Sequence, residues 1–589
     1  VPAMARRVAV IGAGSSGLAC IKCCLDEGLE PVCFESSDDI GGLWRFKETP
    51  EAGCSSVYRS LFSNTSKEMM CFSDFPMPAH YPNYLHHSRL LEYLRLYAEH
   101  FELLKHIHFQ TTVHSVRPRP DFSLSGQWEV VTENKDGLKE THTFDGVLVC
   151  SGHFTHPFMP LSAFPGTLTA LFLCRPSPLK SNGFCYNSSF PAPGIDTFSG
   201  KCCHSWEYKD AELFCGKRVV VVGMGNSGGD IAVEISRVAQ MTFLSTREGA
   251  WVVGRLAGNG LPLDIMLIRR LNSLLLHLLP RALLSWMEER AYNQKYDHRL
   301  YGLQPRHRIL DQRPVINDDL PVCILQGVLQ IKPNIREFRG SRVVFDNGVT
   351  EEGIDVVVFC TGYKATFPFL PPSLTSSPEG DMRLYKRVFP LSLERPTLAV
   401  LGMINVTGPQ MPVMEMQARW AARVFAGLIH LPPLATMHKI TEKEWKENVK
   451  KYSCSKKAAV EREYLPYIDS LAKEVGVYPN VLWMLLTDPA IGLRVLFGPC
   501  TPYQFRLNGP GRWEGARQAI LTQWERLVTP LKTRPIPEPK PSGLFGWGLA
   551  GGALLIFAAI VFQRRNPTFL QNQIAEMTFV GISRWYSFT

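Results

Sequence analysis

The chain contains two glycine-rich GxGxxG motifs, and each comes directly after a run of four apolar residues. The first motif is 12–17, after the run 8–11, and the second is 223–228, after the run 219–222. In a strand–turn–helix the first glycine makes a tight turn, the second lets the backbone approach a pyrophosphate, and the third lets the helix pack on the strand. Each motif therefore predicts a dinucleotide-binding unit whose helix N-terminus receives the pyrophosphate.

The residue that follows the next strand differs between the two motifs. After the first motif, the predicted strand 30–34 ends at Glu35, whose carboxylate can accept hydrogen bonds from ribose hydroxyls and would repel a 2′-phosphate. After the second motif, the predicted strand 241–245 is followed by Thr246 and Arg247, and a guanidinium pairs well with phosphate. The first site is therefore predicted to bind FAD and the second NADPH.

The length of 589 residues favours several domains over a single core. We expect an α/β fold with two nested Rossmann-like dinucleotide-binding domains, for FAD and NADPH, a helical inserted subdomain and a C-terminal membrane helix. The predicted parts are 4–157 (first part of the FAD-binding domain), 158–249 (NADPH-binding domain), 250–327 (helical subdomain), 328–353 (return to the NADPH domain), 354–474 (second part of the FAD domain), 475–534 (helical and loop region), 535–542 (proline-rich linker), 543–562 (membrane helix) and 563–589 (tail).

The segment 543–562 carries no charged residue over 20 positions, which is long enough to cross a bilayer core as a helix. A buried core helix is the alternative, but the preceding prolines and the lack of a polar face favour a membrane span. Basic residues flank both sides, including Arg564 and Arg565, so charge alone leaves the orientation open.

The net charge of +9 does not indicate a nucleic-acid partner, because the Lys and Arg residues are scattered and form no basic run interleaved with aromatics. The 16 cysteines are scattered too, and no signal-peptide pattern precedes the first motif, so we expect a reduced, cytosolic main body. Cys20 and Cys23 form a CxxC inside the helix expected after the first motif, where packing explains them better than redox or metal chemistry. We expect no metal site.

The chain resembles the microsomal flavin-containing monooxygenases, of the dimethylaniline monooxygenase (N-oxide-forming) type, over roughly 5–562. The similarity rests on five segments in order. They are Gly-Gly-Leu-Trp at 41–44, the segment 62–72, the FxGxxxHxxxY signature at 198–208, Cys-Thr-Gly-Tyr at 360–363, and the block 497–506.

The resemblance implies roles for individual residues. Asn64 is the implied catalytic residue beside the flavin and the nicotinamide, and its neutral amide can donate and accept hydrogen bonds without a titrating proton; a turn-forming Asn is the alternative. For His204 a structural role that links the domains is favoured over catalysis. The implied FAD-binding residues are Gly12, Ala13, Gly14, Ser15, Ser16, Gly17, Glu35, Gly42, Leu43, Trp44, Asn64 and Thr65. The implied NADP-binding residues are Ser63, Asn64, Gly223, Gly225, Asn226, Ser227, Gly228, Gly229, Asp230, Thr246 and Arg247.

The activity implied by the resemblance is NADPH- and O₂-dependent oxygenation of soft nucleophilic nitrogen or sulfur atoms in small lipophilic xenobiotic amines or sulfides, through a C4a-hydroperoxyflavin. It also implies contact with membrane lipid, a single C-terminal anchor in the endoplasmic reticulum membrane with the catalytic body in the cytosol, and it is compatible with a homo-oligomer. Baeyer–Villiger oxygenation of ketones or NADPH oxidase activity could use the same cofactors. A disulfide reductase would need a cysteine pair facing the flavin, and none is suitably placed.

The sequence departs from the family pattern at 167–194, which separates the expected neighbours 164–166 and 195–198. Residues 190–194 repeat a Phe-Pro…Gly pattern, and the segment shows no clear periodicity, so we interpret it as an insert and not as a domain. An inactive membrane-anchored flavoprotein, disrupted by this insert, is the alternative from a different functional class.

Overall fold

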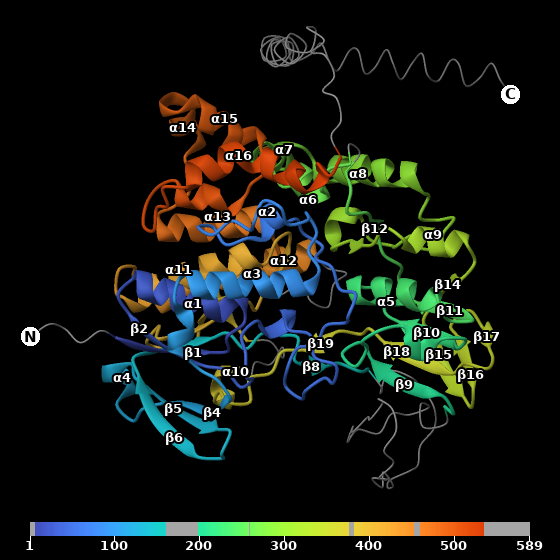
Figure 1. Ribbon diagram of the computed structural model, residues 1–589, viewed down its shortest axis with the longest axis horizontal. Helices are drawn as coiled ribbons and strands as arrows, with labels where there is room; N and C mark the ends of the chain where they lie inside the picture. The colour runs from blue at the N-terminus through green and yellow to red at the C-terminus, as the bar shows by residue number, and fades with distance from the viewer. Residues whose placement is uncertain (1–5, 161–197, 258–259, 376–381, 453–459, 535–589) are drawn as a thin grey trace, which may run out of the picture. The chain divides into compact units, whose positions relative to one another are not determined.

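The first glycine motif follows β1 (Arg7–Ile11), the central strand of a five-stranded parallel sheet in the order β22-β7-β1-β2-β3. The computed structural model describes residues 6–160, 198–257, 260–375, 382–452 and 460–534 (Figure 1). The other strands of this sheet are β2 (Glu30–Phe34), β3 (Ile107–His108), β7 (Gly146–Val149) and β22 (Leu398–Val400).

Alternate residues of β1 enter two different cores. Val8 and Val10 pack in the core that includes α1 (Ser15–Asp26), α3 (His87–His100) and α11 (Met411–Phe425). Ala9 and Ile11 face the opposite core, formed with the antiparallel sheet β4 (Thr111–Pro118), β5 (Trp128–Asn134) and β6 (Lys139–Phe144). Because both faces of the sheet are covered, the strand is an unbroken apolar run instead of an alternating one.

A second five-stranded parallel sheet repeats this plan around β10 (Arg218–Val222), in the order β14-β11-β10-β18-β9. Helices α5 (Asn226–Ser236) and α9 (Leu320–Leu325) contribute to the core on one face. The antiparallel strands β15 (Ile335–Arg339), β16 (Arg342–Phe345) and β17 (Thr350–Glu351) are on the other face. The remaining strands of this sheet are β9 (Lys201–His204), β11 (Met241–Ser245), β14 (Leu329–Lys332) and β18 (Val356–Phe359).

Two of the predicted domain boundaries differ from the structure. The boundary between 353 and 354 is wrong, because β18 pairs in parallel with β10 and so belongs to the second sheet, not to the FAD domain. The end of the predicted helical subdomain also belongs to the second sheet's core, since Val315 and α9 pack there with α5. Apolar periodicity identifies an element, but it does not say which sheet or helix that element joins.

The chain crosses between the two sheets twice, and the two crossings pair with each other. β8 (His156–Pro157) and β19 (Tyr363–Lys364) form an antiparallel ribbon. The amide of Phe158 donates to the carbonyl of Gly362, and the hydroxyl of Thr361 donates to the carbonyl of Phe158. These bonds hold the first and second sheets at a common joint.

The helical subdomain consists of α6 (Leu263–Leu267), α7 (Arg270–Leu278) and α8 (Arg281–Lys295), close to the predicted helical runs. It is anchored on the C-terminal helices by Arg270, whose guanidinium forms two hydrogen bonds to the Asp469 carboxylate, of 2.9 and 3.0 Å, and a third to Gln504. The C-terminal helices are α13 (Tyr464–Val475), α14 (Val481–Thr487), α15 (Pro489–Phe497) and α16 (Ala516–Val528).

The smaller elements complete the described chain. They are η1 (Gly42–Trp44), α2 (Lys67–Met70), η2 (Leu103–His106), α4 (Phe122–Ser125), η5 (Glu212–Phe214), β12 (Val252–Val253), η6 (Ile309–Asp311), β13 (Val315–Ile316), α10 (Pro372–Thr375), β20 (Leu384–Tyr385), β21 (Phe389–Pro390), β23 (Asn405–Thr407), α12 (Leu434–Lys451), β24 (Glu461–Glu463), η7 (Pro502–Arg506) and η8 (Thr529–Leu531). Within the described ranges no helix is both long and apolar enough to cross a membrane. The predicted insert 167–194, membrane helix 543–562 and tail 563–589 lie outside those ranges.

Candidate active site

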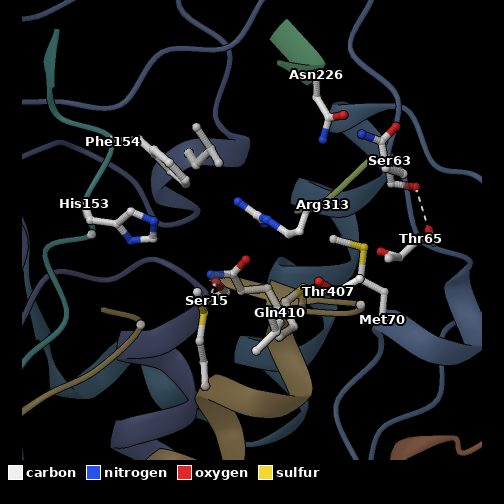
Figure 2. Close-up of a pocket in the computed structure, with 18 of the residues that line it drawn as sticks. Ser15, Ser63, Thr65, Met70, His153, Phe154, Asn226, Arg313, Thr407 and Gln410 are labelled. Carbon is white, nitrogen blue, oxygen red and sulfur yellow. Dashed lines mark hydrogen bonds between the residues drawn. The ribbon is translucent and has the colours of Figure 1, made fainter. Parts of the chain in front are cut away.

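Both glycine motifs open onto one cavity of about 1320 Å³. Its lining includes Gly12 and Gly14 from the first motif, Gly225 and Asn226 from the second, and Asn64. Figure 2 shows Ser15, Ser63, Thr65 and Asn226 around the same space. A pocket for one small ligand is typically about 300–1000 Å³, so this cavity has room for more than one.

The turn after β1 has the geometry that a bound dinucleotide requires. Gly12 has φ +99°, and a methyl group on it would lie 2.9 Å from the carbonyl oxygen of Cys150 at the end of β7. A methyl group on Gly17 would lie 1.8 Å from the carbonyl oxygen of Gly12. Gly14 faces Gly42, where a methyl group would come within 3.1 Å of the Gly14 Cα. The backbone can therefore approach a pyrophosphate from two sides, which fits FAD.

Glu35 lies at the carboxyl end of β2 and lines the cavity. One of its oxygens accepts from the amide of Ala13 (2.7 Å) and the other accepts from the amide and the hydroxyl of Ser37 (2.8 and 2.7 Å). These bonds fix the carboxylate beside the glycine turn, and its remaining lone pairs are available to ribose hydroxyls. Ser15, Ser16, Leu43 and Trp44 also line this end of the cavity.

The turn after β10 reproduces the geometry of the first. Gly223 has φ +106°, and a methyl group on it would lie 2.7 Å from the carbonyl oxygen of Cys360 at the end of β18. A methyl group on Gly228 would lie 1.8 Å from the carbonyl oxygen of Gly223. Gly225 has open space around it, and the Oδ1 of Asn226 accepts from the amide of Ile316 (2.9 Å). The turn fits a second pyrophosphate.

Not every predicted NADP-binding residue faces this cavity. The carboxylate of Asp230 accepts hydrogen bonds from Tyr58 (2.7 Å) and Asn317 (2.8 Å), and burial raises its pKa. It therefore joins the second domain to the first instead of facing the nucleotide. Gly229 packs against Val315. The cavity lining also leaves out Gly223, Ser227, Gly228, Thr246 and Arg247.

Thr246 and Arg247 lie beside the second turn, just after β11. The amide of Gly223 donates to the carbonyl of Ser245, the last residue of β11. Thr246 and Arg247 therefore leave β11 at the point where this strand contacts the glycine turn. The hydroxyl of Thr246 accepts from the amide of Gly249, and Arg247 is exposed. No hydrogen bond or ion pair holds the Arg247 guanidinium within the described chain, which leaves it available to an anion.

Asn64 is oriented by a residue that belongs to none of the sequence motifs. Its Oδ1 accepts a 2.8 Å hydrogen bond from Nη2 of Arg255, and Arg255 is also paired with the Asp318 carboxylate at 3.0 Å. The Nδ2 of Asn64 is thereby left for a bound ligand. Ser63 has a different function, because its hydroxyl donates to the carbonyl of Thr65 and accepts from the amide of Leu85. It shapes the turn that presents Asn64.

Asp264 of α6 holds the same turn from the other side. Its Oδ2 accepts from the amide and the hydroxyl of Ser66, at 2.7 and 3.0 Å. Burial raises the pKa of Asp264 to about 6, although its hydrogen bonds favour the charged form. Arg255, Asp264 and Asp318 are single residues without a sequence motif, so only the tertiary structure brings them to Asn64.

His204 has a structural position. The amide of Trp206 donates to its Nδ1 (3.1 Å), so its Nε2 carries the proton and donates to the carbonyl of Gly362 (3.0 Å). Burial lowers the pKa of His204 to about 4, which keeps it neutral. In the same signature segment the indole of Trp206 donates to the carbonyl of Cys54, which joins the segment to the first domain. These contacts agree with the structural role predicted for His204.

The predicted CxxC is part of the helix core. Cys20 and Cys23 are buried on α1, and burial raises the pKa of both thiols. In the part of the chain that the structure describes, no group of three or more His, Cys, Asp or Glu side chains is arranged to hold a metal ion.

Comparison with known proteins gives a consistent picture. The family model described as "Flavin-binding monooxygenase-like" matches residues 5–175 and 176–564. The chain is 49% identical to flavin-containing monooxygenase 5 of Mus musculus over 538 residues, which covers 91% of this chain and 95% of that protein. It is 45% identical to flavin-containing monooxygenase 3 of Canis lupus familiaris, over 91% of this chain and 95% of that protein.

Solved structures share the fold at lower identity. S-allyl-L-cysteine S-oxygenase from Allium sativum is 22% identical with a TM-score of 0.58, over 89% of this chain and 98% of that one. Cyclohexanone monooxygenase from Rhodococcus sp. Phi1, solved with NADP⁺, is 18% identical with a TM-score of 0.54, over 83% of this chain and 98% of that one.

Proposed function

Because this chain belongs to the flavin-binding monooxygenase-like family, we propose that it binds FAD and NADPH and uses O₂ to oxygenate soft nucleophilic nitrogen or sulfur atoms of small lipophilic compounds. The observation that carries this proposal is the cavity onto which both glycine turns open, with Asn64 in its lining. Hydride transfer requires two dinucleotides to meet at their reactive rings, and a shared cavity is the arrangement that permits it.

The bound flavin, reduced by NADPH, supplies the oxygen-activating chemistry. The chain's own residues position and shield it. Gly14 and Gly42 accommodate the pyrophosphate, and Glu35 receives ribose hydroxyls. Arg255 fixes the Asn64 oxygen, so that the Asn64 amide N–H faces the ligand without a titrating proton. Apolar side chains of α7 and α8, among them Leu275 and Met287, line the same cavity and limit the entry of water.

We expect Arg247→Ala to lower kcat/KM for NADPH about 10- to 150-fold and to leave NADH nearly unaffected. The loss of one charge-assisted contact to the 2′-phosphate corresponds to about 1.5–3 kcal/mol. Steady-state NADPH and NADH oxidation measures both constants. Arg237→Ala is the matched control, because Arg237 is an exposed arginine of the same domain that pairs with Asp319. Equal losses with both nucleotides would contradict the assignment of this site to NADPH.

The oxygenation itself is tested by product analysis with the purified protein. A thioether and a linear ketone are offered with NADPH and O₂, and the sulfoxide, the ester and hydrogen peroxide are quantified. Sulfoxide as the main product supports the proposal, whereas ester formation would favour the Baeyer–Villiger alternative. Peroxide alone would identify an NADPH oxidase. A protein without bound flavin, or whose flavin is not bleached by NADPH, would fit the inactive alternative.

We further propose that the protein is anchored in the endoplasmic reticulum membrane through 543–562, with its catalytic body in the cytosol and with membrane lipid as a partner; assembly as a homo-oligomer stays a prediction. The uncharged 20-residue segment supports an anchor. Exposed apolar side chains on α14 give further support, since Leu482 and Leu486 are 77% and 79% exposed. Apolar surface of this kind is typical of protein or membrane contact.

We expect deletion of 541–589 to leave a flavin-binding body whose association with microsomal vesicles is weakened. Adding Leu482→Ser and Leu486→Ser to the truncated chain should weaken the association with vesicles further, because the remaining contact with the membrane would be made by apolar side chains. Leu124→Ser is the control, since Leu124 is 82% exposed on α4 of the first domain. The measurement is flotation with vesicles in high salt. Undiminished flotation of the truncated chain would refute 543–562 as the anchor.

A further inference from the structure

Arg313 projects a guanidinium into the middle of the cavity. It lies in the short segment between η6 and β13, and Figure 2 shows its side chain directed toward His153 and Phe154, with Asn226 and Ser63 on another side. Arg313 is an exposed residue, and it is part of the cavity lining. Neither glycine motif includes this residue, and the sequence offered no reason to select it.

The charge of Arg313 is not neutralised by a close partner. Within the described ranges it forms no hydrogen bond and no ion pair, whereas Arg255 of the same cavity lining is held by Asp318 and Asn64. Glu461 and Tyr452 favour the charged form, but burial has the larger effect and lowers the pKa of Arg313. A guanidinium stays protonated in proteins, so the cavity contains a fixed positive charge.

Such a charge discriminates between substrates that share the same reacting atom. It repels a protonated amine in a confined space, and its planar donors can bind a carboxylate in a bidentate pair. The turns that would receive the nucleotide pyrophosphates, at Gly14 and Gly225, are on elements other than the one that carries Arg313. We propose that Arg313 is a specificity-determining residue that selects soft nucleophiles bearing an anionic group and disfavours those bearing a cationic one.

The inference rests on the proposed oxygenase function and is tested with three thioethers that differ only in charge. These are 3-(methylthio)propanoate, 3-(methylthio)propanol and 3-(methylthio)propylamine, assayed by sulfoxide formation with the full-length flavin-loaded enzyme. We expect kcat/KM to fall in the order carboxylate, alcohol, amine. Arg313→Gln should lower the value for the carboxylate at least about tenfold, raise that for the amine and leave the alcohol within about twofold.

Two further variants separate charge from structure. Arg313→Lys should restore part of the preference for the carboxylate, because it keeps the charge but loses the bidentate fork. Arg299→Gln, at an exposed position, matches the change in net charge and should leave the order unchanged. Flavin content and KM for NADPH are measured for each variant. An unchanged order in Arg313→Gln, or an equal loss with all three thioethers together with a raised KM for NADPH, would overturn the inference.

A readout that does not need turnover distinguishes failure of this inference from failure of the proposed function. Each thioether is titrated into the flavin-loaded protein, and its Kd is taken from the change in the flavin absorption spectrum. If the wild-type protein makes no sulfoxide from the neutral alcohol, the oxygenase function fails. If it makes sulfoxide but binds the carboxylate no more tightly than the amine, only the role of Arg313 fails.

Discussion

Gly228→Ala is expected to leave FAD bound and to lower the rate of flavin reduction by NADPH by about a hundredfold or more. The added methyl group would lie 1.8 Å from the carbonyl oxygen of Gly223, so either α5 or the turn must move. A displacement of about 1 Å in a reacting geometry can cost about a hundredfold in rate. Anaerobic stopped-flow measurement of flavin bleaching gives the rate, and the flavin spectrum before mixing gives the FAD content.

Gly225→Ala is the matched control in the same turn. Nothing lies within 4 Å of a methyl group placed on Gly225, so the turn keeps its shape. The methyl group would only crowd an approaching pyrophosphate, which should raise KM for NADPH and leave the rate at saturation close to that of the wild type. Near wild-type bleaching by Gly228→Ala would show that the helix can shift without consequence for the nucleotide.

Arg506→Met is expected to destabilise the folded protein by about 3–5 kcal/mol. Its guanidinium, 2% exposed, is paired at 2.8 Å with both Asp74 and Glu415, and it donates to Ser73 at 2.6 Å. Replacing it leaves the buried Glu415 carboxylate without its cation, and breaking a buried pair on one side is strongly destabilising. Lys22 still compensates Asp74 at 2.6 Å, so the main effect falls on Glu415.

Arg517→Met provides the comparison for that stability measurement. Arg517 and Asp488 are 2.9 Å apart, but both side chains are exposed, and such pairs contribute about 0–1 kcal/mol. The free energy of unfolding of each variant is obtained from urea unfolding, monitored by flavin fluorescence and circular dichroism. The charged cluster is formed by Lys22, Asp74, Glu415 and Arg506. If Arg506→Met lowers the free energy of unfolding no more than Arg517→Met does, this cluster does not hold the C-terminal segment on the first domain.

The charged cluster around Arg506 illustrates how much the motif content left undetermined. The block 497–506 matches a family motif, but the motif does not predict the partners of Arg506. These partners are the carboxylates of Glu415 on α11 and of Asp74 after α2. Glu415 lies 91 residues before Arg506 in the chain, and Asp74 lies 432 residues before it. Ion pairs of this kind depend on the packing of helices against one another, which no local pattern encodes.

Asp230 shows the same limit within a motif. It lies two residues after the second glycine motif, so a nucleotide-binding role was a reasonable prediction. The structure instead pairs it with Tyr58 of the first domain and Asn317. The direction of a side chain on α5 depends on which segments cover that helix, and those segments come from distant parts of the chain.

The sequence by itself determined the two strand–turn–helix units and the residues of their turns. Close steric contacts explain this, because Gly12, Gly17, Gly223 and Gly228 each occupy positions where a methyl group would collide with backbone. The unbroken apolar strands likewise follow from sheets covered on both faces. The tertiary structure alone decided that β18 joins the second sheet, and that Arg255, Asp264 and Arg313 line the same cavity as Asn64. Local sterics and periodicity act over a few residues, whereas strand partners and side-chain neighbours are selected by packing across the whole chain.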